Sequence, residues 1–78
     1  MNKARRKQLE DLIDQLNEIK DGIEAVMDEE QEAYDNLPES LQESERGEAM
    51  QENIDNLQAA IDNLNGDVID TIQQVIDA

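Results

Sequence analysis

The chain has 78 residues and a formal net charge of −15 at pH 7, and it contains neither cysteine nor histidine. A chain this short builds a small core, so its stability depends on disulfides, a metal, oligomerisation or very regular helix packing. The missing cysteine and histidine exclude disulfides, the usual zinc sites and nucleophilic catalysis by a Cys–His or Ser–His pair. Regular helix packing and oligomerisation remain as the sources of stability.

The first regular pattern runs from about Lys3 to Asn36. Its apolar residues recur at alternating spacings of three and four, which places them on one face of an α-helix. The stripe consists of Leu9, Leu12, Leu16, Ile19, Ile23 and Val26, and Ile13 and Met27 widen it. This spacing predicts a long amphipathic helix over residues 3–36.

The pattern is interrupted over residues 37–44. Pro38 disfavours helix at Leu37 and suits the first turn of a new helix. Ser40 and Ser44 are candidate N-caps, so the segment can hold a short helical turn before the next long helix begins. A connection this short between two long helices predicts an antiparallel hairpin.

A second apolar ladder begins at Ile54. It consists of Ile54, Ile61, Val68 and Val75, each followed three residues later by Leu57, Leu64, Thr71 and Ala78. Such a seven-residue repeat is typical of a coiled-coil helix. Asn65–Gly66–Asp67 is the one break signal, but we expect a continuous helix over residues 45–77 because the ladder stays in phase across it.

The predicted fold is therefore all-α, with residues 1–78 forming one antiparallel two-helix coiled-coil hairpin. Some apolar side chains lie off the two stripes and would stay partly exposed in that hairpin. They are Ile13, Met27, Ile69, Ile72 and Ile76. Exposed apolar surface of this kind usually marks an interface, so we expect a homodimer that forms a four-helix bundle. A different protein could cover the same face.

No enzymatic activity, cofactor or metal site is expected. Carboxylate pairs such as Asp11 with Asp14 share a helix face, but acid–base catalysis also needs a pocket that separates their pKa values. Aligning Gly66 with the invariant glycine of a calcium-binding EF-hand loop puts Ile61 at the first ligand position and leaves no glutamate at the twelfth. Two interpretations of the acidic run 28–35 stay open: it binds divalent cations weakly, or it is simply a solvated helix face.

The charge is unevenly distributed along the chain. All 21 acidic residues follow Lys7, accompanied by only two basic residues, Lys20 and Arg46. Such a surface repels nucleic acid and anionic membranes and attracts basic proteins. The predicted partner contacts near the turn are Asp28, Glu29, Glu30, Glu32, Asp35, Glu39, Glu43 and Glu45. No apolar run approaches the roughly 20 residues of a membrane span, and we expect a cytoplasmic protein without direct nucleic-acid or membrane contact.

Two segments of the chain carry a resemblance to known proteins. They are the turn sequence Glu29–Met50, with Tyr34, Pro38 and Arg46–Gly47, and the opening MNKARRKQLEDLIDQL. They resemble small uncharacterised acidic coiled-coil proteins encoded by phages, prophages and other mobile elements of Gram-positive gut bacteria. The resemblance covers nearly the whole chain, although Asn65–Gly66 departs from the continuous heptads of that group. The resemblance implies an origin in a bacterial host cell more than a mechanism. Small acidic proteins from such elements do include inhibitors of CRISPR and restriction systems.

Two hypotheses for the function follow. The first is a non-enzymatic protein-binding module, an acidic inhibitor that blocks a basic nucleic-acid-binding site on a host defence protein such as a nuclease complex. The alternative is a structural coiled coil that acts through self-assembly or phage assembly, with its acidity serving solubility.

Overall fold

The computed structural model describes all 78 residues, and nearly all of them are helical. The elements are α1 (Lys3–Asp35), α2 (Glu39–Gln42), α3 (Glu45–Asn63), the π-helical segment η1 (Leu64–Ile69) and α4 (Asp70–Asp77). There is no strand, so the prediction of an all-α fold is confirmed.

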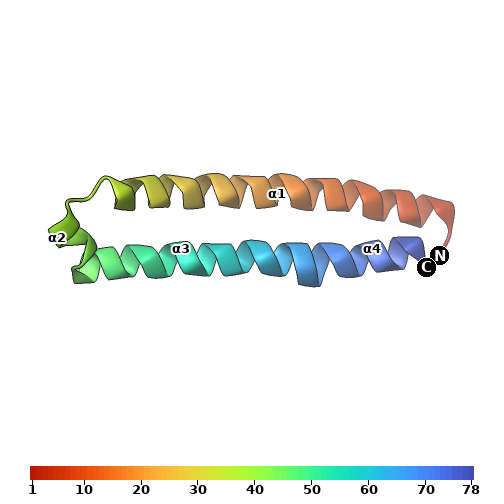
Figure 1. The fold of residues 1–78 in the computed structure, drawn as a ribbon. Helices are drawn as coiled ribbons and strands as arrows, with labels where there is room; N and C mark the ends of the chain where they lie inside the picture. Colours follow the sequence, from red (N-terminus) through yellow and green to blue (C-terminus); the bar gives the residue numbers. More distant parts are fainter.

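The helices form an elongated rod, and this name is used below for the whole molecule. Figure 1 shows α1 running alongside α3 and α4 in the opposite direction, with α2 at one end of the rod and both termini at the other. The rod measures 58 × 16 × 11 Å between Cα atoms. Its radius of gyration is 17.4 Å, whereas a compact domain of this length has about 11.5 Å. Most side chains therefore have only one neighbouring helix to pack against.

Hydrogen bonds at both ends of α1 explain where this helix begins and where the chain turns. The Asn2 side-chain oxygen accepts from the backbone N–H of Arg5 at 2.8 Å, which caps the first turn. After α1, the carbonyl of Pro38 accepts from the backbone N–H of Leu41 at 2.8 Å and begins α2. The Ser44 hydroxyl donates to the Leu41 carbonyl, so it closes α2 instead of capping α3.

The face of α1 that packs against α3 and α4 is rotated from the predicted stripe. Both stripes share Leu9, Leu16 and Ile23. The structure completes this row with Ile13, Lys20 and Met27, which are buried or half-buried. The predicted members Leu12, Ile19 and Val26 are instead 48%, 55% and 56% exposed. Residues that pack between α1 and the α3–α4 segment are called the seam below.

A second correction concerns the ladder beyond Leu64. The helix continues through Asn65–Gly66, but η1 contains one residue more than a regular α-helix would need between seam positions. The seam therefore passes from Leu64 to Ile69, five residues later, and continues through Ile72 and Ile76. Val68 and Val75, which the ladder places inside, are 38% and 41% exposed.

Packing and local helix propensity account for this change of phase. The π-helical segment buries isoleucines at three positions where a regular α-helix would bury Val68, Thr71 and Val75. Each additional buried methylene stabilises the fold by about 0.8 kcal/mol, and burying a threonine hydroxyl is avoided. The α-helix is also intrinsically weak here, because Asn65, Gly66 and Asp67 have poor helix propensity.

The main core cluster forms at the end of the rod that carries the termini. Ile13, Ile69 and Ile76 are each 8% exposed and are packed by Leu9, Leu16 and Ile72. Ile13, Ile69 and Ile76 were expected to stay partly exposed, and that expectation is wrong because the rotated α1 face and η1 both turn them inward. Met27 and Ile72 are half-buried along the same seam.

Gly47 is required where α2 approaches α3. A Cβ atom at this position would lie 2.0 Å from the carbonyl oxygen of Gln42 and 2.5 Å from its carbonyl carbon. Both atoms belong to the backbone, so they cannot move aside without displacing α2. The side-chain amide of Gln42 also donates to the Tyr34 carbonyl at 3.1 Å, which ties this turn to the end of α1.

Deleting Gly66 tests the origin of η1. Removal of one residue lets the helix keep the same buried isoleucines with regular α-helical geometry, so we expect the melting temperature to stay equal or rise. Deleting Gly22 from the regular helix α1 is the matched control, because it moves half of the seam out of phase. The melting temperature of that control, measured by circular dichroism, is expected to fall by more than about 10 °C. A Gly66 deletion as damaging as the control contradicts this explanation.

Gly47→Ala tests the close approach at the turn. We expect a loss of about 1–3 kcal/mol in the free energy of unfolding, measured by urea titration, because the added methyl group overlaps the α2 backbone. Gly66→Ala is the control, since a Cβ atom there meets nothing within 4 Å. Equal stability of the Gly47→Ala chain and the unsubstituted chain would disprove the contact.

Candidate functional site

The rod has two broad faces, one on each side of the plane that contains both helix axes. Two antiparallel helices are related by an approximate twofold axis perpendicular to that plane, so residues with equivalent places relative to the seam lie on the same face. Leu12 and Ile19 each precede a seam residue of α1 by one position. Val68 and Val75 do the same in the η1–α4 segment, so all four side chains belong to one face.

This side is called the apolar face below. It carries Leu12, Ile19, Val26, Ala33, Ala60, Val68 and Val75, together with the polar Asn53, and it is bordered by Gln8, Gln15, Gly22, Ala49, Asn56, Asn63 and Thr71. All these residues are exposed except Ala60, which is half-buried. Glu29 and Asp67 are the acidic residues at its border, and Arg5 and Arg46 lie at its two ends. The face is nearly free of carboxylates in a chain that has 21 of them.

The opposite face is polar throughout. Its residues follow seam positions by one and are Glu10, Asn17, Glu24, Gln31, Gln51, Gln58, Asn65 and Gln73. Several of these amides form hydrogen bonds within the chain, for example Gln58 to Asp62 at 3.0 Å and Gln73 to Asp77 at 3.1 Å. Lys20 of the seam reaches Asn65 at 3.4 Å. This face is well matched to water.

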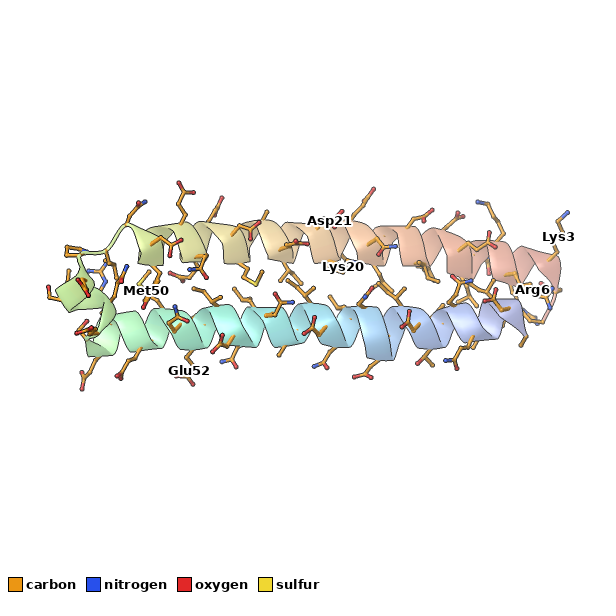
Figure 2. All side chains as sticks on the ribbon, viewed as in Figure 1. Lys3, Arg6, Lys20, Asp21, Met50 and Glu52 are labelled. Atoms are coloured by element: carbon orange, nitrogen blue, oxygen red, sulfur yellow. The ribbon has the colours of Figure 1, made fainter.

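Most carboxylates lie in two rows along the outer edges of the rod. The α1 edge consists of Asp11, Asp14, Glu18, Asp21, Asp28, Glu32 and Asp35. The α3–α4 edge consists of Glu45, Glu48, Glu52, Asp55, Asp62, Asp70 and Asp77. In Figure 2, Asp21 and Glu52 point away from each other on these opposite edges, while Lys20 and Met50 lie between the helices. These rows are called the acidic edges below.

The acidic edges are scarcely neutralised by cations. Every carboxylate of the chain is exposed except Glu30, which is half-buried. The only ion pair joins Lys7 and Asp11 at 2.9 Å, and both side chains are well exposed. The hydrogen bond that Lys7 donates to Asp11, and then the negative charge of Asp11, raise the pKa of Lys7 above its ordinary value. The remaining carboxylates are available to a partner.

The predicted contact residues near the turn do not form one surface. Asp28, Glu32 and Asp35 lie on the α1 edge and Glu45 on the α3–α4 edge. Glu39 lies in α2, and Glu43 directly follows it. Glu29 borders the apolar face, and Glu30 lies half-buried at the seam. The Asp35 carboxylate accepts from Gln31 at 3.0 Å.

Other carboxylates of the α3–α4 edge, among them Glu48, Glu52, Asp55 and Asp62, were not included in the predicted set. Their spacings of three, four and seven residues would have identified them as one helix face.

The basic residues gather at the end of the rod that carries the termini. Lys3, Arg5, Arg6 and Lys7 begin α1, and one Arg6 guanidinium nitrogen donates to the Ala78 main-chain oxygen at 3.0 Å. Figure 2 shows Lys3 and Arg6 at this end, remote from the turn. The rod therefore has a basic end and a strongly acidic one, where Arg46 alone accompanies the ten carboxylates of residues 28–52.

The rod has no pocket, and no three acidic residues come close enough to hold a metal ion. None of its helices combines the length and the apolar character needed to cross a membrane. Comparison with protein-family models, with curated proteins and with solved structures finds no match.

The acidic edges predict that salt stabilises the fold. Neighbouring carboxylates repel one another across a few ångströms, and the screening length falls from about 30 Å at 0.01 M salt to about 3 Å at 1 M. We expect the melting temperature to rise by several degrees between these sodium chloride concentrations. The variant Asp14→Asn, Asp21→Asn, Asp28→Asn should show a smaller rise. A melting temperature that falls with salt would contradict dominant repulsion along the edges.

Proposed function

We propose that this chain is a helical hairpin that acts as a non-enzymatic binding protein, with its acidic edges binding the basic nucleic-acid site of another protein. The observation that carries this proposal is the pair of exposed, largely unpaired carboxylate rows on opposite edges of one rod. The two rows run antiparallel, as the two phosphate strands of a duplex do. A basic groove that accommodates a duplex therefore meets negative charge on both of its walls, whether it holds the duplex or the rod.

The charge density is sufficient for such competition. The 58 Å length divided by 21 carboxylates gives about 2.8 Å per charge, compared with about 1.7 Å for duplex DNA and 3.4 Å for one strand. Along the α1 edge alone the spacing is about 6 Å, from the helical rise of 1.5 Å per residue. The rod thus offers a basic groove less charge than a duplex does, so binding should be tight at low salt and weaken steeply as salt rises.

The proposed class of partner is a nuclease of a bacterial defence system. The turn sequence and the opening segment support this choice through their resemblance to small acidic proteins of phages and mobile elements. Blocking the nucleic-acid groove of such a nuclease requires no catalytic residue. Charge complementarity and a rigid rod that fits the groove are enough.

The alternative function is structural, a coiled coil whose role is its own assembly. The apolar face supports this alternative, because the acidic edges do not account for it. In that case the carboxylates keep the assembly soluble.

The two functions are separated by binding measurements with a purified Cas nuclease, a restriction endonuclease and cytochrome c as a generic basic protein. We expect submicromolar binding to at least one nuclease at 0.15 M salt, displacement of its DNA, and at least tenfold weaker binding to cytochrome c. Equal binding to all three, or none, contradicts the proposal.

A matched pair of variants tests the role of the acidic edge. Glu48→Gln, Glu52→Gln, Asp55→Asn removes three charges from the α3–α4 edge. Glu10→Gln, Glu24→Gln, Glu30→Gln removes three charges that lie outside both edges. The first variant is expected to bind the nuclease at least tenfold more weakly than the second, and equal losses would contradict a specific role for the edge.

A further inference from the structure

We propose that the apolar face binds a second copy of the chain and that the two rods form a four-helix bundle with their turns at opposite ends. This inference uses Leu12, Ile19, Val26, Val68 and Val75, whereas the proposed function uses the acidic edges. The two proposals can therefore fail separately.

The isolated rod leaves its core incomplete. Only five apolar side chains are buried, and none is less than 2% exposed. The accessible surface is 5591 Å², whereas a compact monomer of 8.9 kDa exposes about 4800 Å². The excess of roughly 800 Å² matches the area that each partner contributes to a standard protein interface.

The exposed apolar side chains are concentrated on one face. Seven large hydrophobic residues are exposed, and five of them lie on the apolar face, which leaves only Met1 and Leu41 elsewhere. The opposite face has no apolar residue at the equivalent positions. A role in solubility does not explain this asymmetry, because both faces would then be polar. The asymmetry is typical of a helix pair with one buried and one solvated side.

Charge identifies the second copy as the occupant. Two chains that each carry −15 repel one another, unless they meet through a surface that is nearly free of carboxylates. The apolar face is that surface. A basic partner would instead select the acidic edges, where its charges find carboxylates. Glycine at position 22, where a Cβ atom would meet nothing within 4 Å, also lets another helix approach this face closely.

Charge also sets the orientation. Ten of the 21 carboxylates lie in residues 28–52 at the turn, and four of the six basic residues lie at the other end of the rod. Placing the turns at opposite ends separates the two acidic turns and brings each beside a basic end. Neighbouring helices are antiparallel in this arrangement, as they would also be with the turns at the same end, so charge alone decides between the two.

The apolar face is self-complementary in this orientation. Ile19 is close to the middle of α1, so the twofold axis passes near it and Leu12 lies opposite Val26 of the second copy. Arg5 then lies opposite Ala33 of the second copy, one helical turn from Glu29. Glu29, which borders the face, is thus placed near a cation.

Light scattering after size-exclusion chromatography tests the assembly at 10–100 μM protein and 0.15 M salt. We expect about twice the 8.9 kDa chain mass for the unsubstituted chain. Ile19→Glu, Val68→Glu should give a helical monomer. Gln58→Glu, Gln73→Glu, which adds the same charge to the opposite face, should remain dimeric. A monomeric unsubstituted chain, or a dimer that survives the substitutions on the apolar face, overturns the proposal.

Cysteine cross-linking tests the orientation. Ile19→Cys is expected to form an intermolecular disulfide in air, because the two copies of this position meet near the twofold axis. Leu12→Cys should not, because its two copies lie about 21 Å apart along the bundle, at 1.5 Å per residue. With the turns at the same end, α1 would face α3 and α4 of the second copy and the two Ile19 positions would lie on diagonally opposite helices. A dimer in which Ile19→Cys forms no intermolecular disulfide would therefore overturn the orientation.

Discussion

The packing of Ile13 against Ile69 and Ile76 sets the rotation of each helix about its own axis, and the remaining surface depends on it. With Ile13 inside, Leu12, Ile19 and Val26 must lie outside, because a helix presents adjacent residues on different sides. In the same way, Ile69 and Ile76 inside leave Val68 and Val75 outside. The core therefore determines both its own contents and the position of the exposed apolar side chains.

The same rotation separates three kinds of surface on a narrow rod. Most carboxylates occupy the outer edges, amides and two glutamates one face, and aliphatic side chains the other. A charged partner and a second copy of the chain would thus contact different residues. A small chain without cysteine, histidine or a pocket can in this way combine assembly with recognition, because the long rod supplies surface that its thin core does not use.

The sequence was sufficient to predict the all-α fold, since two long stretches of helical periodicity are separated by a short segment that contains Pro38. It was not sufficient for the seam, because two stripes that share Leu9, Leu16 and Ile23 differ by only one position on α1. Across Gly66, the ladder of Val68, Thr71 and Val75 is in phase, so periodicity alone favours it. The packing of three isoleucines around Ile13, together with the poor helix propensity of Asn65–Gly66–Asp67, favours the π-helical alternative. The acidic rows needed no such packing information and could have been found completely from their spacing.

The most direct test of this account is a methyl NMR spectrum of isotope-labelled protein, with contacts within one chain separated from contacts between chains. The account predicts nuclear Overhauser effects within one chain from the Ile13 methyl groups to those of Ile69 and Ile76. It predicts none from Ile13 to Val68 or Val75 of the same chain. Contacts within the chain from Ile13 to both valines, without contacts to the isoleucines, would contradict the π-helical register and with it the apolar face.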